Sequence, residues 1–149
     1  MNIADLKPYS PITEREIIAF EKQISFELPE DYRSFLLMSN GGGLRGYRFY
    51  VDYLETEFST DVFYGLGLVD GLNLSYWIGE YHDEIPEKTV LIGGDPGGIH
   101  LIYITQGEDK GIYIWDHAHM IPASDEEGNT YFIAESFEEF IKSLKKFIP

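Results

Sequence analysis

Three short apolar segments separated by glycine-rich turns constrain the fold of this chain most strongly. They run from Thr89 to Ile92, from Ile99 to Thr105 and from Ile112 to Asp116, and the turns between them read GGDPGG and QGEDKG. Short segments rich in Ile, Val and Tyr are typical of strands, and turns of this composition join consecutive strands. The pattern predicts an antiparallel meander.

Four further segments carry the sequence signs of helices. Apolar residues recur at a spacing of three and four, and the first and last segments open with the capping boxes Thr13 to Glu16 and Ser136 to Glu139. In the closing segment the apolar stripe reaches Ile148. The predicted helices cover residues 13–25, 29–39, 72–82 and 136–148.

A strand is predicted near the middle of the chain, since apolar and wetter residues alternate from Tyr47 to Tyr53. A weaker strand signal covers Val62 to Tyr64. Helices at both ends, a middle helix and a meander indicate an α+β fold with a mainly antiparallel β-sheet covered by helices. At 149 residues the chain is expected to form one domain over residues 1–149.

Composition excludes several classes of function. The chain has no cysteine, so thiol catalysis, cysteine-based metal sites and disulfides are excluded, and no cofactor motif is present. Neither a signal peptide nor a membrane-spanning apolar run is visible, so a cytoplasmic protein without membrane contact is expected. The net charge of −15 and the lack of a visible basic patch argue against nucleic acid as a partner.

The acidic residues are concentrated in two stretches of the sequence. Nine acids and no Lys or Arg lie between Arg48 and Lys88, and seven acids lie between Lys110 and Lys142. Such stretches either keep a small protein soluble or form a docking face for a cationic partner.

The motifs that could carry chemistry have ordinary structural explanations. Asp116, His117 and His119 in the run D-H-A-H could hold a metal or transfer protons, but a third ligand and an open coordination position are not identifiable. GGDPGG lacks the Lys-Ser/Thr of a phosphate-binding loop and is expected to be a hairpin turn. The acids of Asp125-Glu126-Glu127-Gly128 are expected to form an exposed turn rather than a calcium loop. No catalytic residue is assigned.

The order of several segments resembles the SUKH superfamily, which includes fungal cell-wall regulators of the Smi/Knr type and many bacterial immunity proteins. The segments that carry the resemblance are ITEREIIAFEKQISFELPEDYRSFLLMSNGGG, VLIGGDPGGIHLIYI, GIYIWDH and IAESFEEFIKSL. The resemblance implies an α+β domain without a known catalytic site that binds and silences a polymorphic toxin, in many cases a nuclease.

The leading functional hypothesis is therefore a non-enzymatic immunity protein that neutralises a basic toxin domain by occluding it, with acidic side chains that mimic phosphate. One alternative is a regulatory scaffold like the fungal members, and a remote one is a small metal-dependent hydrolase that uses the D-H-A-H run. The partner-binding residues expected from the acidic stretch are Asp52, Glu55, Glu57, Asp61, Asp83 and Glu84.

Overall fold

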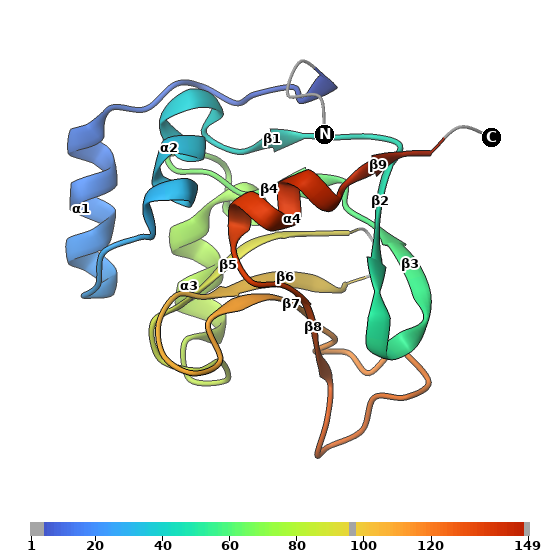
Figure 1. Cartoon of the computed structure of the whole chain (residues 1–149). Coiled ribbons are helices and arrows are strands. Elements are labelled where there is room, and N and C mark those ends of the chain that lie inside the picture. Colours follow the sequence, from blue (N-terminus) through green and yellow to red (C-terminus); the bar gives the residue numbers. More distant parts are fainter. Residues whose placement is uncertain (1–4, 96–97, 148–149) are drawn as a thin grey trace.

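The predicted meander forms the centre of a six-stranded antiparallel sheet (Figure 1). The structure is a computed structural model that describes residues 5–95 and 98–147, so two residues of the GGDPGG turn, Pro96 and Gly97, lie outside the described residues. In spatial order the strands are β1 (Gly42–Gly43), β4 (Val62–Phe63), β5 (Thr89–Gly94), β6 (His100–Ile104), β7 (Gly111–Trp115) and β8 (Thr130–Ala134).

The described part of the chain has four α-helices close to the predicted ranges: α1 (Glu14–Ile24), α2 (Glu30–Ser39), α3 (Leu74–Tyr81) and α4 (Phe137–Ser143). Both predicted capping boxes contribute N-caps: Thr13 accepts from the Glu16 amide, and Ser136 accepts from the Glu139 amide. Helix α3 starts later than predicted because the Asn73 side chain caps it by accepting from the Ser75 amide.

The helices cover both faces of the large sheet. Successive side chains of a strand point to opposite faces, so His100 and Tyr103 of β6 lie on different sides. Tyr103 packs edge-on against Tyr32 of α2, which also contacts Phe137 of α4. On the other face, the ring of Trp77 in α3 lies 4.9 Å from the His100 ring. Helices α2 and α4 therefore cover one face, and α3 covers the other. The predicted α+β fold is confirmed.

A second, three-stranded sheet has the order β3 (Thr56–Ser59), β2 (Tyr47–Val51) and β9 (Lys145–Lys146). Phe49 of β2 points inward and lies 5.3 Å from the ring of Phe140 in α4, which joins this sheet to the core. The alternation predicted from Tyr47 holds as far as Val51, where the strand ends. A 3₁₀ turn, η2 (Asp52–Leu54), follows it, and the side chain of Tyr53 is 79% exposed. The expectation that Tyr53 continues the apolar face is wrong because the turn changes the direction of its side chain.

The closing helix is shorter than predicted. Helix α4 ends at Ser143, and Leu144 takes an extended conformation. Lys145 and Lys146, which the prediction included in the helix, instead pair with β2. Ile148 lies outside the described residues. The extended backbone at Leu144 keeps that side chain buried while it turns the chain toward β2.

The buried residue Asn40 holds three parts of the chain together at the end of α2. Its side-chain amide donates to the carbonyl oxygens of Ser10 at 2.8 Å and Leu66 at 2.9 Å, and its Oδ1 accepts from the Leu66 amide at 2.8 Å. Its backbone is left-handed, with φ of 52°, as a helix C-cap requires. A Cβ on Gly65 would lie 2.2 Å from the Asn40 carbonyl oxygen, so glycine is required there for this close approach.

Candidate functional site

The tip of the β2–β3 hairpin is exposed and acidic. Asp52, Glu55 and Glu57 are all exposed there, and the backbone of Glu55 is left-handed, with φ of 49°. Two tyrosines accompany them: Tyr53 at the tip, and Tyr50, which pairs with Glu57 across the strands and is 51% exposed. The tip therefore combines carboxylates with exposed aromatic rings, a composition that suits contact with a cationic protein surface.

The loop between β7 and β8 brings a second group of acids to the surface. Asp125, Glu126 and Glu127 are exposed, as predicted for this turn. The Asp125 carboxylate accepts from the amides of Glu127 at 2.9 Å and Gly128 at 2.8 Å, which fixes a tight turn.

A chain of contacts joins the hairpin tip to this loop. The rings of Tyr53 and Tyr131 lie 5.8 Å apart, and the Tyr131 hydroxyl lies 2.9 Å from the Ser124 hydroxyl. The Ser124 hydroxyl in turn donates to the buried carboxylate of Asp116 at 2.7 Å. Figure 1 shows the tip of the hairpin and the loop together at the lower right of the view. The name acidic end is used below for this group: Asp52, Glu55, Glu57, Asp125, Glu126 and Glu127.

The remaining predicted binding residues lie in two different places. Asp83 and Glu84 follow α3, where the Glu84 carboxylate lies 3.1 Å from the His117 imidazole at the start of the β7–β8 loop. Glu84 therefore contacts the base of the loop that carries half of the acidic end, and Asp83 precedes it in the chain. Asp61 lies apart from them, in a cavity that is also lined by Lys7, Arg45 and Lys146. Its surroundings are mixed in charge rather than acidic.

Asp116 of the D-H-A-H run holds the backbone of the β7–β8 loop in place instead of forming a reactive group. Asp116 is fully buried, and its carboxylate accepts from the amides of Met120 at 2.8 Å and Ile121 at 2.7 Å as well as from Ser124. Within residues 5–95 and 98–147, no three His, Asp or Glu side chains are placed to hold a metal ion. The placement of Asp116 gives no support to the hydrolase alternative, because this carboxylate is engaged in fixing the backbone.

Replacing Asp116 with alanine is expected to lower the free energy of unfolding by about 2 to 4 kcal/mol, because it leaves buried donors without an acceptor. Burial alone would raise the pKa of this carboxyl, but hydrogen bonds from Ser124, Ile121 and Met120, together with nearby His119, hold the pKa below its usual 3.8. The stabilisation is therefore present at neutral pH and is lost as the pH falls through that lowered pKa. Urea unfolding at neutral pH measures the loss, and an unchanged midpoint would contradict this assignment.

An aromatic cluster between α3 and the sheet encloses the buried imidazole of His100. Trp77, Tyr81 and Trp115 lie with their ring centroids 4.9, 5.5 and 5.7 Å from it. The Tyr64 hydroxyl is 3.4 Å from Nδ1. Burial, with a smaller contribution from His117, lowers the pKa of His100 to about 4. The imidazole is therefore neutral at physiological pH and serves as part of the core.

His100 makes the free energy of unfolding depend on pH in a defined window. In the unfolded chain the imidazole takes up a proton near its ordinary pKa of 6.5, whereas the folded protein resists protonation until about pH 4. Stability contributed by the neutral ring is therefore present above pH 6.5 and declines toward pH 4, by about 2 to 3 kcal/mol. Urea unfolding of the wild type and of His100→Gln at pH 7.5 and 4.5 tests this. The free energy of unfolding should fall more between pH 7.5 and pH 4.5 in the wild type than in His100→Gln. An equal decrease in both proteins would contradict this role of His100.

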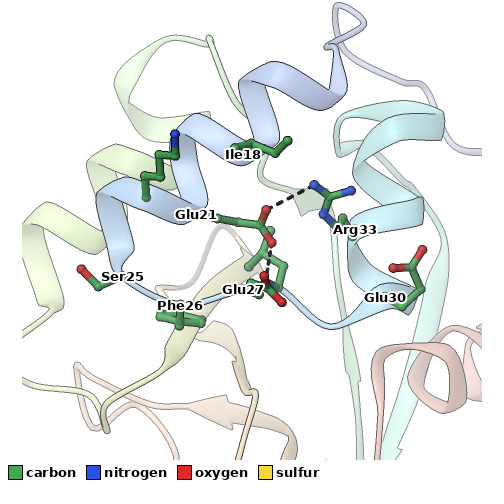
Figure 2. A pocket seen from close by; sticks show the side chains of 9 residues that line it. Ile18, Glu21, Ser25, Phe26, Glu27, Glu30 and Arg33 are labelled. Atoms are coloured by element: carbon green, nitrogen blue, oxygen red, sulfur yellow. Dashed lines mark hydrogen bonds and ion pairs between the residues drawn. The ribbon is translucent and has the colours of Figure 1, made fainter.

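A cavity of about 700 Å³ lies beside α1 and α2 (Figure 2). The carboxylate of Glu21 in its wall accepts from the Leu28 amide at 2.7 Å and from Arg33 at 3.3 Å. Arg33 also reaches Glu14 at 2.5 Å. Figure 2 shows Glu21 and Arg33 directed toward each other across the connection between the helices. These polar groups fix that connection, so the acidic end is the stronger candidate for function.

The sequence indicates both acidic stretches but not the contacts that join them. Tyr131 and Ser124 were not singled out, because no strand was predicted over residues 130–134. The alternation of buried Tyr131 with exposed Phe132 is the signal that could have identified β8. No helix in the described part of the chain is long and apolar enough to span a bilayer.

Comparisons with known proteins agree with the fold. The model of the SMI1 / KNR4 family (SUKH-1) matches residues 11–143. A curated relative, the SPbeta prophage-derived uncharacterized protein YokK of Bacillus subtilis (strain 168), is 29% identical over 160 aligned positions, which cover 89% of this chain and 74% of the relative. SUKH-1 proteins are known as immunity proteins of polymorphic toxin systems and are generally non-catalytic. Because the family model matches most of its length, the chain belongs to the SMI1 / KNR4 family (SUKH-1).

Proposed function

We propose that this chain is an immunity protein that binds a basic domain of a polymorphic toxin through its acidic end and occludes that domain. Family membership supports the class of function. The observation that carries the choice of surface is the linkage of two acidic stretches, separated in sequence, through the contact between Tyr53 and Tyr131.

Charge explains why this surface suits such a partner. A protein with a net charge of −15 attracts a cationic domain over several ångströms, and clustered carboxylates direct that attraction to one end. A toxin that cleaves nucleic acid presents cations to phosphate, and a group of carboxylates can occupy those cations in place of phosphate. Inhibition by occlusion requires no chemistry from the inhibitor.

The exposed tyrosines add contact area that charge alone does not supply. Tyr53 and Tyr50 flank the carboxylates and expose 79% and 51% of their surface. Tyrosine is enriched among the residues that contribute most to protein interfaces, because its ring covers a large area at a small cost in side-chain entropy. Asp83 and Glu84 extend the proposed surface along the base of the β7–β8 loop, while Asp61 is not included because it lies among cations.

Co-expression with a candidate polymorphic-toxin domain from the same genomic neighbourhood tests the proposed function. The expected result is that growth is restored and that the two proteins co-purify at low salt, with a smaller yield of complex at high salt. Toxicity that persists although both proteins are produced and folded would overturn the proposal. A complex insensitive to salt would retain the immunity function but contradict the acidic surface.

A further inference from the structure

The end of the molecule away from the hairpin tip gathers cations that are scattered in the sequence. In the β2–β9 register Arg48 lies opposite Lys145, and Tyr47 lies opposite Lys146. An isolated bridge places Lys7 against Gly43, two residues before Arg45. Strand pairing therefore brings together cations that are distant in the sequence. The name basic end is used for this group of five among the eleven Lys and Arg residues of the chain: Lys7, Arg45, Arg48, Lys145 and Lys146.

Most of these cations are not neutralised by the chain itself. Lys146 lies 3.7 Å from the Asp5 carboxylate, and the guanidinium of Arg48 lies 3.8 Å from the centre of the Phe147 ring. Among residues 5–95 and 98–147, no carboxylate comes within ion-pair distance of Lys7, Arg45 or Lys145. Arg48 and Lys145 lie opposite each other on neighbouring strands, but neither lines the cavity that Lys146 borders.

A cavity of about 710 Å³ opens between these elements, with Lys7, Arg45 and Lys146 in its wall. The carboxylates of Asp5 and Asp61 share the wall, so three cations stand against two acids. The Asp5 carboxylate already accepts from the Tyr47 hydroxyl and pairs with Lys146, which leaves Lys7 and Arg45 beside the single carboxylate of Asp61. A volume of several hundred cubic ångströms is typical of sites for small molecules. We propose that this cavity binds a small multivalent anion that carries phosphate groups, such as pyrophosphate or a nucleoside triphosphate.

The net charge of the protein favours a small ligand over a polymer. A nucleic acid strand would extend from the basic end into the negative field produced by the acidic residues that cover the rest of the protein, whereas pyrophosphate stays within the cavity. Lys ammonium groups bind phosphate as point charges, and the Arg45 guanidinium can donate two parallel hydrogen bonds to it. The inference concerns the free protein and does not rest on the toxin-binding proposal.

Calorimetric titration of the free protein at low ionic strength tests the proposal, with pyrophosphate, adenosine triphosphate and a short single-stranded oligonucleotide as separate probes. The expected result is saturable binding of pyrophosphate or the triphosphate. Arg45→Gln and Lys7→Gln should each weaken it by about tenfold, as expected for loss of a charge-assisted contact. Lys146→Arg, which keeps the charge, should retain binding.

Lys88→Gln and Lys110→Gln are matched controls, since each removes one exposed cation elsewhere on the surface. They should leave the affinity unchanged, and thermal unfolding without ligand confirms that every variant is folded. Absence of saturable binding, or equal weakening by the control variants, would overturn the proposal. Tighter binding of the oligonucleotide than of both small anions would also overturn it.

Discussion

Replacing Asn40 with alanine is expected to lower the free energy of unfolding by about 3 to 5 kcal/mol, a large part of the stability of an ordinary domain. The variant loses three hydrogen bonds of a fully buried side chain and leaves polar groups of Ser10 and Leu66 without partners. Each such group costs about 1 to 3 kcal/mol when buried. Alanine also fits the left-handed backbone at this position less well, by about 1 kcal/mol.

Two variants separate these contributions to the loss in Asn40→Ala. Asn40→Gly removes the same hydrogen bonds but tolerates a φ of 52°, so it should be less destabilised than the alanine variant. Ser25 has a similar φ of 67° but is exposed, and because Ser and Ala carry the same Cβ, Ser25→Ala should cost less than about 1 kcal/mol. Urea unfolding measures all three. A loss in Asn40→Ala no larger than that in Ser25→Ala would show that the buried hydrogen bonds do not stabilise the fold.

Reversing two charges at the hairpin tip is expected to weaken toxin binding by about a hundredfold, which corresponds to about 2.8 kcal/mol. The double variant Glu55→Lys and Glu57→Lys places cations where the proposed partner presents its own. Both residues are exposed, so the variant should fold like the wild type. Equilibrium titration of the purified toxin domain measures the change.

The matched control reverses two acids outside the acidic end. Glu27 and Glu108 are exposed in other loops, and their replacement by Lys changes the net charge by the same amount. Because the total charge of the two double variants is equal, only the position of the charges differs between them. If the control variant binds the toxin domain with nearly the affinity of the wild type, the result supports the acidic end as the binding surface. If both double variants lose the same affinity, net charge alone governs binding.

Helices and strands whose apolar residues recur at a regular spacing could be predicted from the sequence. Strands that form only because they pair with a distant segment of the chain could not. Helix α1 and strands β5 to β7 were found because helical spacing and short apolar runs are local signals. Strand β9 consists of two exposed lysines and forms only because the chain after α4 lies beside β2. Nothing in its own composition indicates a strand. The two-residue strand β1 is also defined by its pairing with β4.

The candidate site was predictable in content but not in arrangement. The sequence identified Asp52, Glu55 and Glu57 as members of an acidic stretch, and the acids of residues 125–127 as members of another. That the two stretches meet depends on Tyr53 leaving the strand, and the turn at η2 that causes this carries no clear sequence signal. Asp61 was expected to lie with its neighbours in sequence, but it lines a cavity of mixed charge next to the β1–β4 pair.

The rate constant for association with the toxin domain, measured across a range of ionic strength, tests the central claim most directly. If an acidic end steers a basic partner, the rate constant falls steeply as salt rises, while the dissociation rate constant changes much less. The Glu55→Lys and Glu57→Lys variant should show a slower and flatter dependence than the wild type. An association rate constant that does not change with salt would contradict the account, even if the two proteins form a tight complex.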